Sequence, residues 1–230
     1  MNESLQNQYG YANAGLAADR QRVLRNTYWL LALSLVPTVL GAWIGVATGV
    51  FALMSPGMST LVFFIGAFGL MFVVEKTKDS AAGVAALLGF TFFMGLMLSR
   101  LVGYVLGFKN GTSLVMTAFG GTAAVFFAMA SLATVIKRDV SSMGKFLVVG
   151  SVVLMVAGIA NIFLHSSALM LTILVMMLGV FSAFMLYDIK RVIDGGETNY
   201  ISATLNIYLD LYNVFQSLLS LLGIFGGDRD

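Results

Sequence analysis

Two aspartates lie inside strongly apolar stretches of the sequence, where a charge is costly. Asp210 is in "NIYLDLYNVFQS", residues 206–217, and Asp188 is in "LYDIKR", residues 186–191. On membrane-insertion scales, an ionised carboxylate at the centre of a spanning helix costs about 2.5–3.5 kcal/mol. Two carboxylates that meet in a site of low dielectric cannot both ionise cheaply, so such a pair is expected to hold one proton. These residue types therefore point to a proton-sensing pair.

Asp210 belongs to a longer polar stripe. Polar residues recur around it at spacings of four, three, four and three: Asn206, Asp210, Asn213, Ser217 and Ser220. At about 100° per residue, this spacing confines them to one face of a helix. A polar group in hydrocarbon needs a partner, so this face is expected to turn inward, against other helices or water, and to line a pathway.

The elements that must position these residues are membrane helices. Of the 230 residues, 59% are hydrophobic and 10% are charged, compared with about 25% charged in an average soluble domain. A spanning helix needs about 20 mostly apolar residues. The sequence offers seven such runs, at 28–49, 58–74, 81–106, 113–136, 146–164, 168–189 and 203–224. We therefore predict an all-α, polytopic membrane protein with three parts: a disordered cytoplasmic tail over 1–26, a transmembrane domain over 27–225 and a short tail over 226–230.

Basic residues near the ends of the spans predict the orientation, because they concentrate on the cytoplasmic side. One set of alternating loops holds most of them: Arg20, Arg22, Arg25, Lys76, Lys78, Lys137, Arg138, Lys145, Lys190 and Arg191. The other set holds Lys109, Arg229 and, at the border of a span, Arg100. The N-terminus is thus predicted to be cytoplasmic and, with an odd number of spans, the C-terminus periplasmic.

In this orientation both aspartates lie toward the cytoplasmic side. Asp188 is within about one turn of the inner boundary of the sixth span, and Asp210 is roughly 7–13 Å into the seventh at 1.5 Å per residue. Consecutive antiparallel helices commonly pack, so the two carboxyl groups could meet. The alternative for Asp188 is that it reaches the interface beside Lys190 and Arg191.

Several other kinds of site are disfavoured by the composition. The sequence has no cysteine, which excludes disulfides and thiolate sites, and its one histidine, His165, has no acidic cluster around it, so no metal site or cofactor is predicted. The net charge of +2 is small and spread over loops, so nucleic acid is not an expected partner. Proteases that cut within membranes use an aspartate dyad, but no glycine precedes Asp210, and no enzyme is predicted.

The last third of the chain carries a family resemblance, in "YDIK" and "GGETNYISATLNIYLDLYNVFQSLLSLLG". Together with "LRNTY", "GGTAAVFF" and "ANIFL" earlier in the chain, these segments resemble the Bax inhibitor-1 family, and within it the bacterial YccA-like branch. The resemblance implies seven helices with the seventh in the centre. It also implies an inner-membrane protein that binds and modulates the membrane-anchored AAA protease FtsH, which could grip the N-terminal tail.

The same resemblance implies a second activity, a calcium leak closed by a pH-sensitive aspartate pair. The positions of that pair match Asp188 and Asp210. In the calcium-leak members a basic residue at the inner end of the second helix completes the latch. Here Glu75 stands in that region, and Lys76 and Lys78 are the possible substitutes. A pair without a cation would open at high pH, whereas a pair latched to a cation would open on protonation. The sequence is therefore compatible with either sign of the pH dependence.

Overall fold

The chain folds into seven helices in the computed structural model, which describes residues 3–51 and 54–228, and the side chains of 18–51, 54–55 and 57–228. All seven contain a segment long and apolar enough to cross a membrane. They are α1 (Glu3–Thr48), α2 (Pro56–Thr77), α3 (Ala81–Leu106), α4 (Gly111–Val135), α5 (Ser141–Leu164), α6 (Ser167–Asp194) and α7 (Tyr200–Gly226). The prediction of an all-α membrane protein with seven spanning helices is confirmed.

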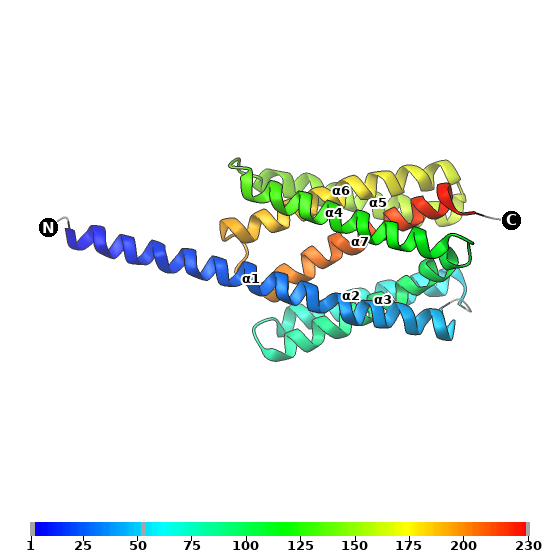
Figure 1. Ribbon diagram of the computed structural model, residues 1–230, viewed down its shortest axis with the longest axis horizontal. Coiled ribbons are helices and arrows are strands. Elements are labelled where there is room, and N and C mark those ends of the chain that lie inside the picture. The colour runs from blue at the N-terminus through cyan, green and yellow to red at the C-terminus, as the bar shows by residue number, and fades with distance from the viewer. Residues whose placement is uncertain (1–2, 52–53, 229–230) are drawn as a thin grey trace.

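The helices form two groups with α7 between them (Figure 1). One group consists of α1, α2 and α3, in which α3 packs against the other two. The second consists of α4, α5 and α6, in which α6 packs against the other two. The seventh helix contacts α1, α2, α3, α4 and α6, and it is the most buried of the seven spans. The predicted central position of the last helix is therefore confirmed.

Close contact between α1 and α3 depends on glycines. A Cβ atom on Gly41 would lie 2.2 Å from the carbonyl oxygen of Phe92, and one on Gly95 would lie 2.1 Å from that of Thr38. Four residues after Gly41, Gly45 faces the Ser99 side chain in the same way. Small residues at such spacing let membrane helices approach backbone to backbone. This crossing fixes α1 and α3 as one wall beside α7.

The N-terminal segment differs from the sequence prediction. We expect a disordered tail over residues 1–26 from its polar composition, whereas α1 begins at Glu3 and extends well beyond the bundle (Figure 1). The segment contains Ala, Leu, Gln and Arg, which favour helix. It also continues directly into the first span, so it needs no new helix nucleus. Met1 and Asn2 lie outside the described residues, as do Arg229 and Asp230 of the predicted C-terminal tail.

Candidate functional site

Asp188 and Asp210 meet between α6 and α7. The two carboxyl groups lie close enough for each to act on the other. A carboxylate can only accept hydrogen bonds, so a hydrogen bond between the two groups would require one of them to carry a proton. Asp210 is 4% exposed and Asp188 is partly buried. The structure thus brings together the two aspartates selected from the sequence.

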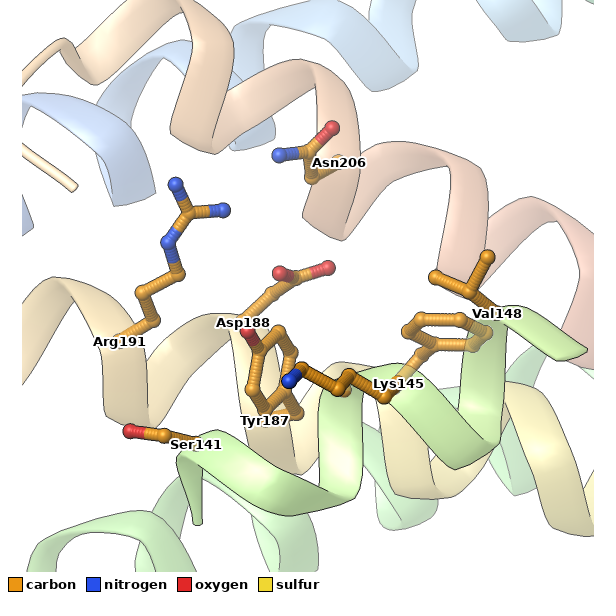
Figure 2. A pocket seen from close by; sticks show the side chains of 9 residues that line it. Ser141, Lys145, Val148, Tyr187, Asp188, Arg191 and Asn206 are labelled. Carbon is orange, nitrogen blue, oxygen red and sulfur yellow. The ribbon is translucent and has the colours of Figure 1, made fainter. Parts of the chain in front are cut away.

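Asp188 also borders a pocket, which connects the pair to the surface. The pocket has a volume of about 630 Å³ and is walled by the beginning of α5, the end of α6 and one residue of α7. In Figure 2 the Asp188 carboxylate points toward Asn206, which projects from α7. Asp188 therefore stands between the buried Asp210 and a space that opens outward, where a proton could enter or leave.

The polar stripe on α7 faces inward along its length. Asp210 and Ser217 are buried, whereas Asn206, Asn213 and Ser220 are partly buried. The Asn213 side chain donates a hydrogen bond to the carbonyl oxygen of Leu209, 2.8 Å away within the same helix. Among the described residues, the buried side-chain oxygens without a hydrogen-bond partner are Asp210 Oδ2 and Ser217 Oγ, both of which belong to the stripe.

Lys76 and Lys78, the two lysines considered as latch cations, are not the cations that act on Asp188. Lys78 forms an ion pair with Glu75, and this hydrogen bond raises the pKa of the Lys78 ammonium group. Lys76 is exposed in the last turn of α2. The cation that acts on Asp188 is Arg191, one turn away on the same helix. The sequence did not show which cation faces Asp188. In the structure Lys78 is paired with Glu75, three residues before it.

The "GGETNY" loop ties the start of α7 to the turn between α2 and α3. The Asn199 side chain caps α7 by accepting hydrogen bonds from the backbone N–H groups of Ile201 and Ser202, at 2.9 and 3.2 Å. Its amide nitrogen donates to Asp79 Oδ1 at 2.9 Å, and the Ser202 hydroxyl donates to Glu75 at 3.0 Å. Glu75 therefore anchors α7, a role that its charge alone did not suggest.

A second polar contact fixes the opposite face of α7. The buried Tyr208 hydroxyl lies 2.8 Å from Thr38 Oγ1 of α1 and 3.4 Å from the carbonyl oxygen of Thr91 in α3. Thr38 is also placed to donate to the carbonyl oxygen of Ser34 at 2.9 Å, and either hydroxyl can be the donor in the contact between Tyr208 and Thr38. Sequence analysis missed this contact, because Tyr208 and Thr38 are ordinary residues in apolar runs.

Comparison with known proteins gives a consistent result over nearly the whole chain. Residues 20–227 match the family model described as "Inhibitor of apoptosis-promoting Bax1". "Modulator of FtsH protease YccA" of Escherichia coli strain K12 is 39% identical over 90% of this chain and 92% of its own length. The "Inner membrane protein YccA" of a second E. coli strain matches equally well. An "Uncharacterized membrane protein" of Vibrio cholerae is 36% identical over 91% of this chain and 92% of its own.

Proposed function

The chain belongs to the Bax inhibitor-1 family, and on this premise we propose that it binds the membrane protease FtsH in the bacterial inner membrane and modulates its activity. The observation that carries the proposal is the 39% identity to a modulator of FtsH protease, which extends over 90% of the chain. Because the identity covers all seven helices, it favours a shared role of the whole bundle. The relative of E. coli strain K12 is named as a modulator, and we propose no enzymatic activity.

The position of α1 supports this role. Beyond the bundle, the helix continues as an isolated rod at the end that carries most of the basic residues (Figure 1). The distribution of basic residues favours a cytoplasmic location for this end. A rod of this kind would be accessible to the cytoplasmic part of a membrane-anchored protease.

The test combines co-purification with a degradation assay. The tagged full-length protein, isolated from native membranes, is expected to retain FtsH and to slow its degradation of a membrane substrate. Deleting residues 3–17 is expected to weaken both effects and leave the bundle intact. Failure to recover FtsH from membranes, together with unchanged degradation, would remove the proposal.

A second candidate function is a pH-sensitive cation leak, with calcium as the first ion to test. It is favoured by the two unpartnered oxygens of the stripe, Asp210 Oδ2 and Ser217 Oγ, because buried polar atoms without partners suit a path that water or ions visit. The Asp188–Asp210 pair would gate the path from its pocket side, with Asn206, Asn213, Ser217 and Ser220 along it.

The charges around the pair suggest the sign of the pH dependence. The groups that act on Asp188 are Asp210 from α7, Arg191 from its own helix and Glu197 from the following loop. Lys145 of α5 borders the same pocket. With Lys78 held by Glu75, the pair lacks the latch cation of the second helix. Loss of the shared proton would then leave two carboxylates that repel, and flux should rise with pH.

Calcium flux into proteoliposomes from pH 6 to pH 8 tests this candidate. Wild-type flux should increase with pH, and Asp210→Asn should make it independent of pH, because an amide cannot lose a proton in this range. Equal flux in both proteins at every pH would mean that the pair gates nothing. The assay contains no protease, so its outcome does not affect the FtsH proposal.

A further inference from the structure

The pocket beside Asp188 has a polar end and an apolar end. Ser141 and Lys145 lie in the first two turns of α5, and Arg191 lies in the last turn of α6, so these three line the mouth of the pocket. Val148 and Phe184 lie farther into the membrane-spanning part of the same helices. The lining therefore changes from basic to apolar along the direction in which a phospholipid changes from headgroup to acyl chain.

Two cations are available at the mouth. Within the described part of the chain, Lys145 has no ion-pair partner, and it is exposed. The Arg191 guanidinium is 3.6 Å from Glu197 and donates to the carbonyl oxygen of Gly196 at 3.3 Å, which leaves donors of its planar fork unused. The Ser141 hydroxyl already donates to Asp139. Binding of an anion at this mouth would thus depend mainly on Lys145 and Arg191.

Tyr187 forms one wall of the pocket because α5 has a glycine opposite it. A Cβ atom on Gly144 would lie 2.6 Å from the Tyr187 hydroxyl oxygen, so only glycine lets the ring lie this close to α5. In Figure 2 the end of the Lys145 side chain lies beside the Tyr187 ring, with the Asp188 carboxylate above the ring and Arg191 to the upper left. Tyr187 therefore forms part of the pocket wall where α5 and α6 meet.

The apolar end of the pocket borders the acyl chains of the bilayer. α5 packs against α6 and against no other helix of the described chain, so its remaining surface faces lipid. Val148 is 54% exposed although it lines the pocket and lies on a spanning helix. A lipid chain could therefore enter the pocket from the side, while its headgroup stays level with the beginning of α5.

From this arrangement we infer that the pocket binds one glycerophospholipid of the surrounding membrane, with its phosphate between Lys145 and Arg191 and an acyl chain along Val148 and Phe184. Basic pockets between membrane helices commonly bind phosphate-bearing headgroups. Asp188 on the inner wall favours a headgroup that also carries an ammonium group, since a purely anionic one would meet the carboxylate. The inference does not depend on the FtsH proposal.

Native mass spectrometry of the full-length protein in detergent, titrated with phosphatidylethanolamine, tests the inference. Loss of one charge-assisted hydrogen bond should weaken binding about tenfold or more in Lys145→Ala. Val148→Trp, which fills the apolar end, should weaken it to a similar extent. Both wild-type side chains are exposed, so neither change should disturb folding.

Matched controls separate this site from general affinity for lipid. Lys137→Ala removes an exposed cation from the same end of the bundle, and Val149→Trp adds the same bulk at a neighbouring position that is 64% exposed and outside the pocket. Both should bind lipid as the wild type does. Equal binding by all four variants would overturn the site. Phosphatidylglycerol should bind more weakly than phosphatidylethanolamine, and glycerol phosphate or inorganic phosphate binding as tightly as the lipid would overturn the acyl-chain contact.

Discussion

The two faces of α7 are built in opposite ways. Toward α1 and α3, two buried hydroxyl groups of this helix have partners: Tyr208 binds Thr38, and the Thr204 hydroxyl donates to the carbonyl oxygen of Tyr200 at 2.6 Å. Toward α6, the same helix carries Asp210 and Ser217, whose oxygens Oδ2 and Oγ are buried without partners. One helix therefore has a face where Tyr208 and Thr204 are hydrogen-bonded, the satisfied face, and, roughly half a turn away, a face where Asp210 and Ser217 keep unpartnered oxygens, the unsatisfied face.

The face of α7 toward α1 and α3 stabilises the bundle, whereas the face toward α6 carries the groups that could have a function. The α1–α3 wall is held by backbone contact at Gly41 and Gly95, and a rigid wall fixes the height and rotation of α7. The α6 side keeps a carboxyl pair that apolar residues could replace at lower cost in a membrane. A costly polar group that packing does not require indicates function, and here it adjoins a pocket.

The largest expected effect is on the satisfied face. In Gly95→Ala the new Cβ would meet the Thr38 carbonyl oxygen at 2.1 Å, so α1 and α3 must separate, and the free energy of unfolding should fall by about 3 kcal/mol. Gly120→Ala is the matched control, because no atom lies within 4 Å of the added group. Unfolding titrations in detergent compare the two, and equal stability would contradict the close crossing.

The next effect concerns the unsatisfied face and depends on pH. If the folded pair still holds, near neutral pH, a proton that the unfolded chain has already released at more acidic pH, the folded state binds more protons, and stability falls as pH rises. The slope can reach about 1.4 kcal/mol per pH unit for one proton. Asp210→Asn should flatten it. Unfolding titrations from pH 6 to pH 8 measure both slopes, and a flat wild-type profile would argue against proton sharing.

Tyr208→Phe should have a smaller effect and one of a different kind. It removes the hydrogen bond to Thr38 while Thr38 keeps its bond to Ser34, so the loss should be about 1 kcal/mol in the free energy of unfolding. The pH slope of stability should stay as in the wild type, because the two faces are independent. A changed slope in this variant would show that the faces are coupled.

Ser217→Ala should have the smallest effect. Its hydroxyl has no partner in the described chain, so its removal should change stability by no more than about 0.5 kcal/mol, or raise it slightly. Thermal unfolding beside the wild type measures this. A loss above about 1 kcal/mol would mean that the hydroxyl binds a water or ion in the protein.

Much of the fold could be predicted from the sequence because apolar length decides membrane spans. The predicted run at 81–106 coincides with α3, and the run at 113–136 differs from α4 (Gly111–Val135) by one or two residues. The inward turn of the polar stripe also followed from helical periodicity, and the two aspartates meet as expected. The role of the pair and of the stripe remains a prediction.

The rest could not be predicted because it depends on contacts between distant residues. Gly120 faces open space and the adjacent Gly121 lies close to the Leu218 side chain of α7, while Gly41 and Gly95 carry the tight crossing of α1 and α3. Which glycine faces a neighbouring backbone depends on helix rotation, which composition does not encode. The pairing of Lys78 with Glu75 likewise depends on side-chain conformation. The N-terminal segment is helical because it continues directly into the first span.

Infrared titration of the carboxyl groups tests the central claim most directly. If Asp188 and Asp210 share one proton, the wild type near neutral pH should show a protonated-carboxyl band that disappears in Asp210→Asn and shifts in frequency in Asp188→Asn, where the buried Asp210 can hold a proton by itself. A band that survives in Asp210→Asn, a band that is unchanged in Asp188→Asn, or the absence of any such band in the wild type would contradict the shared proton.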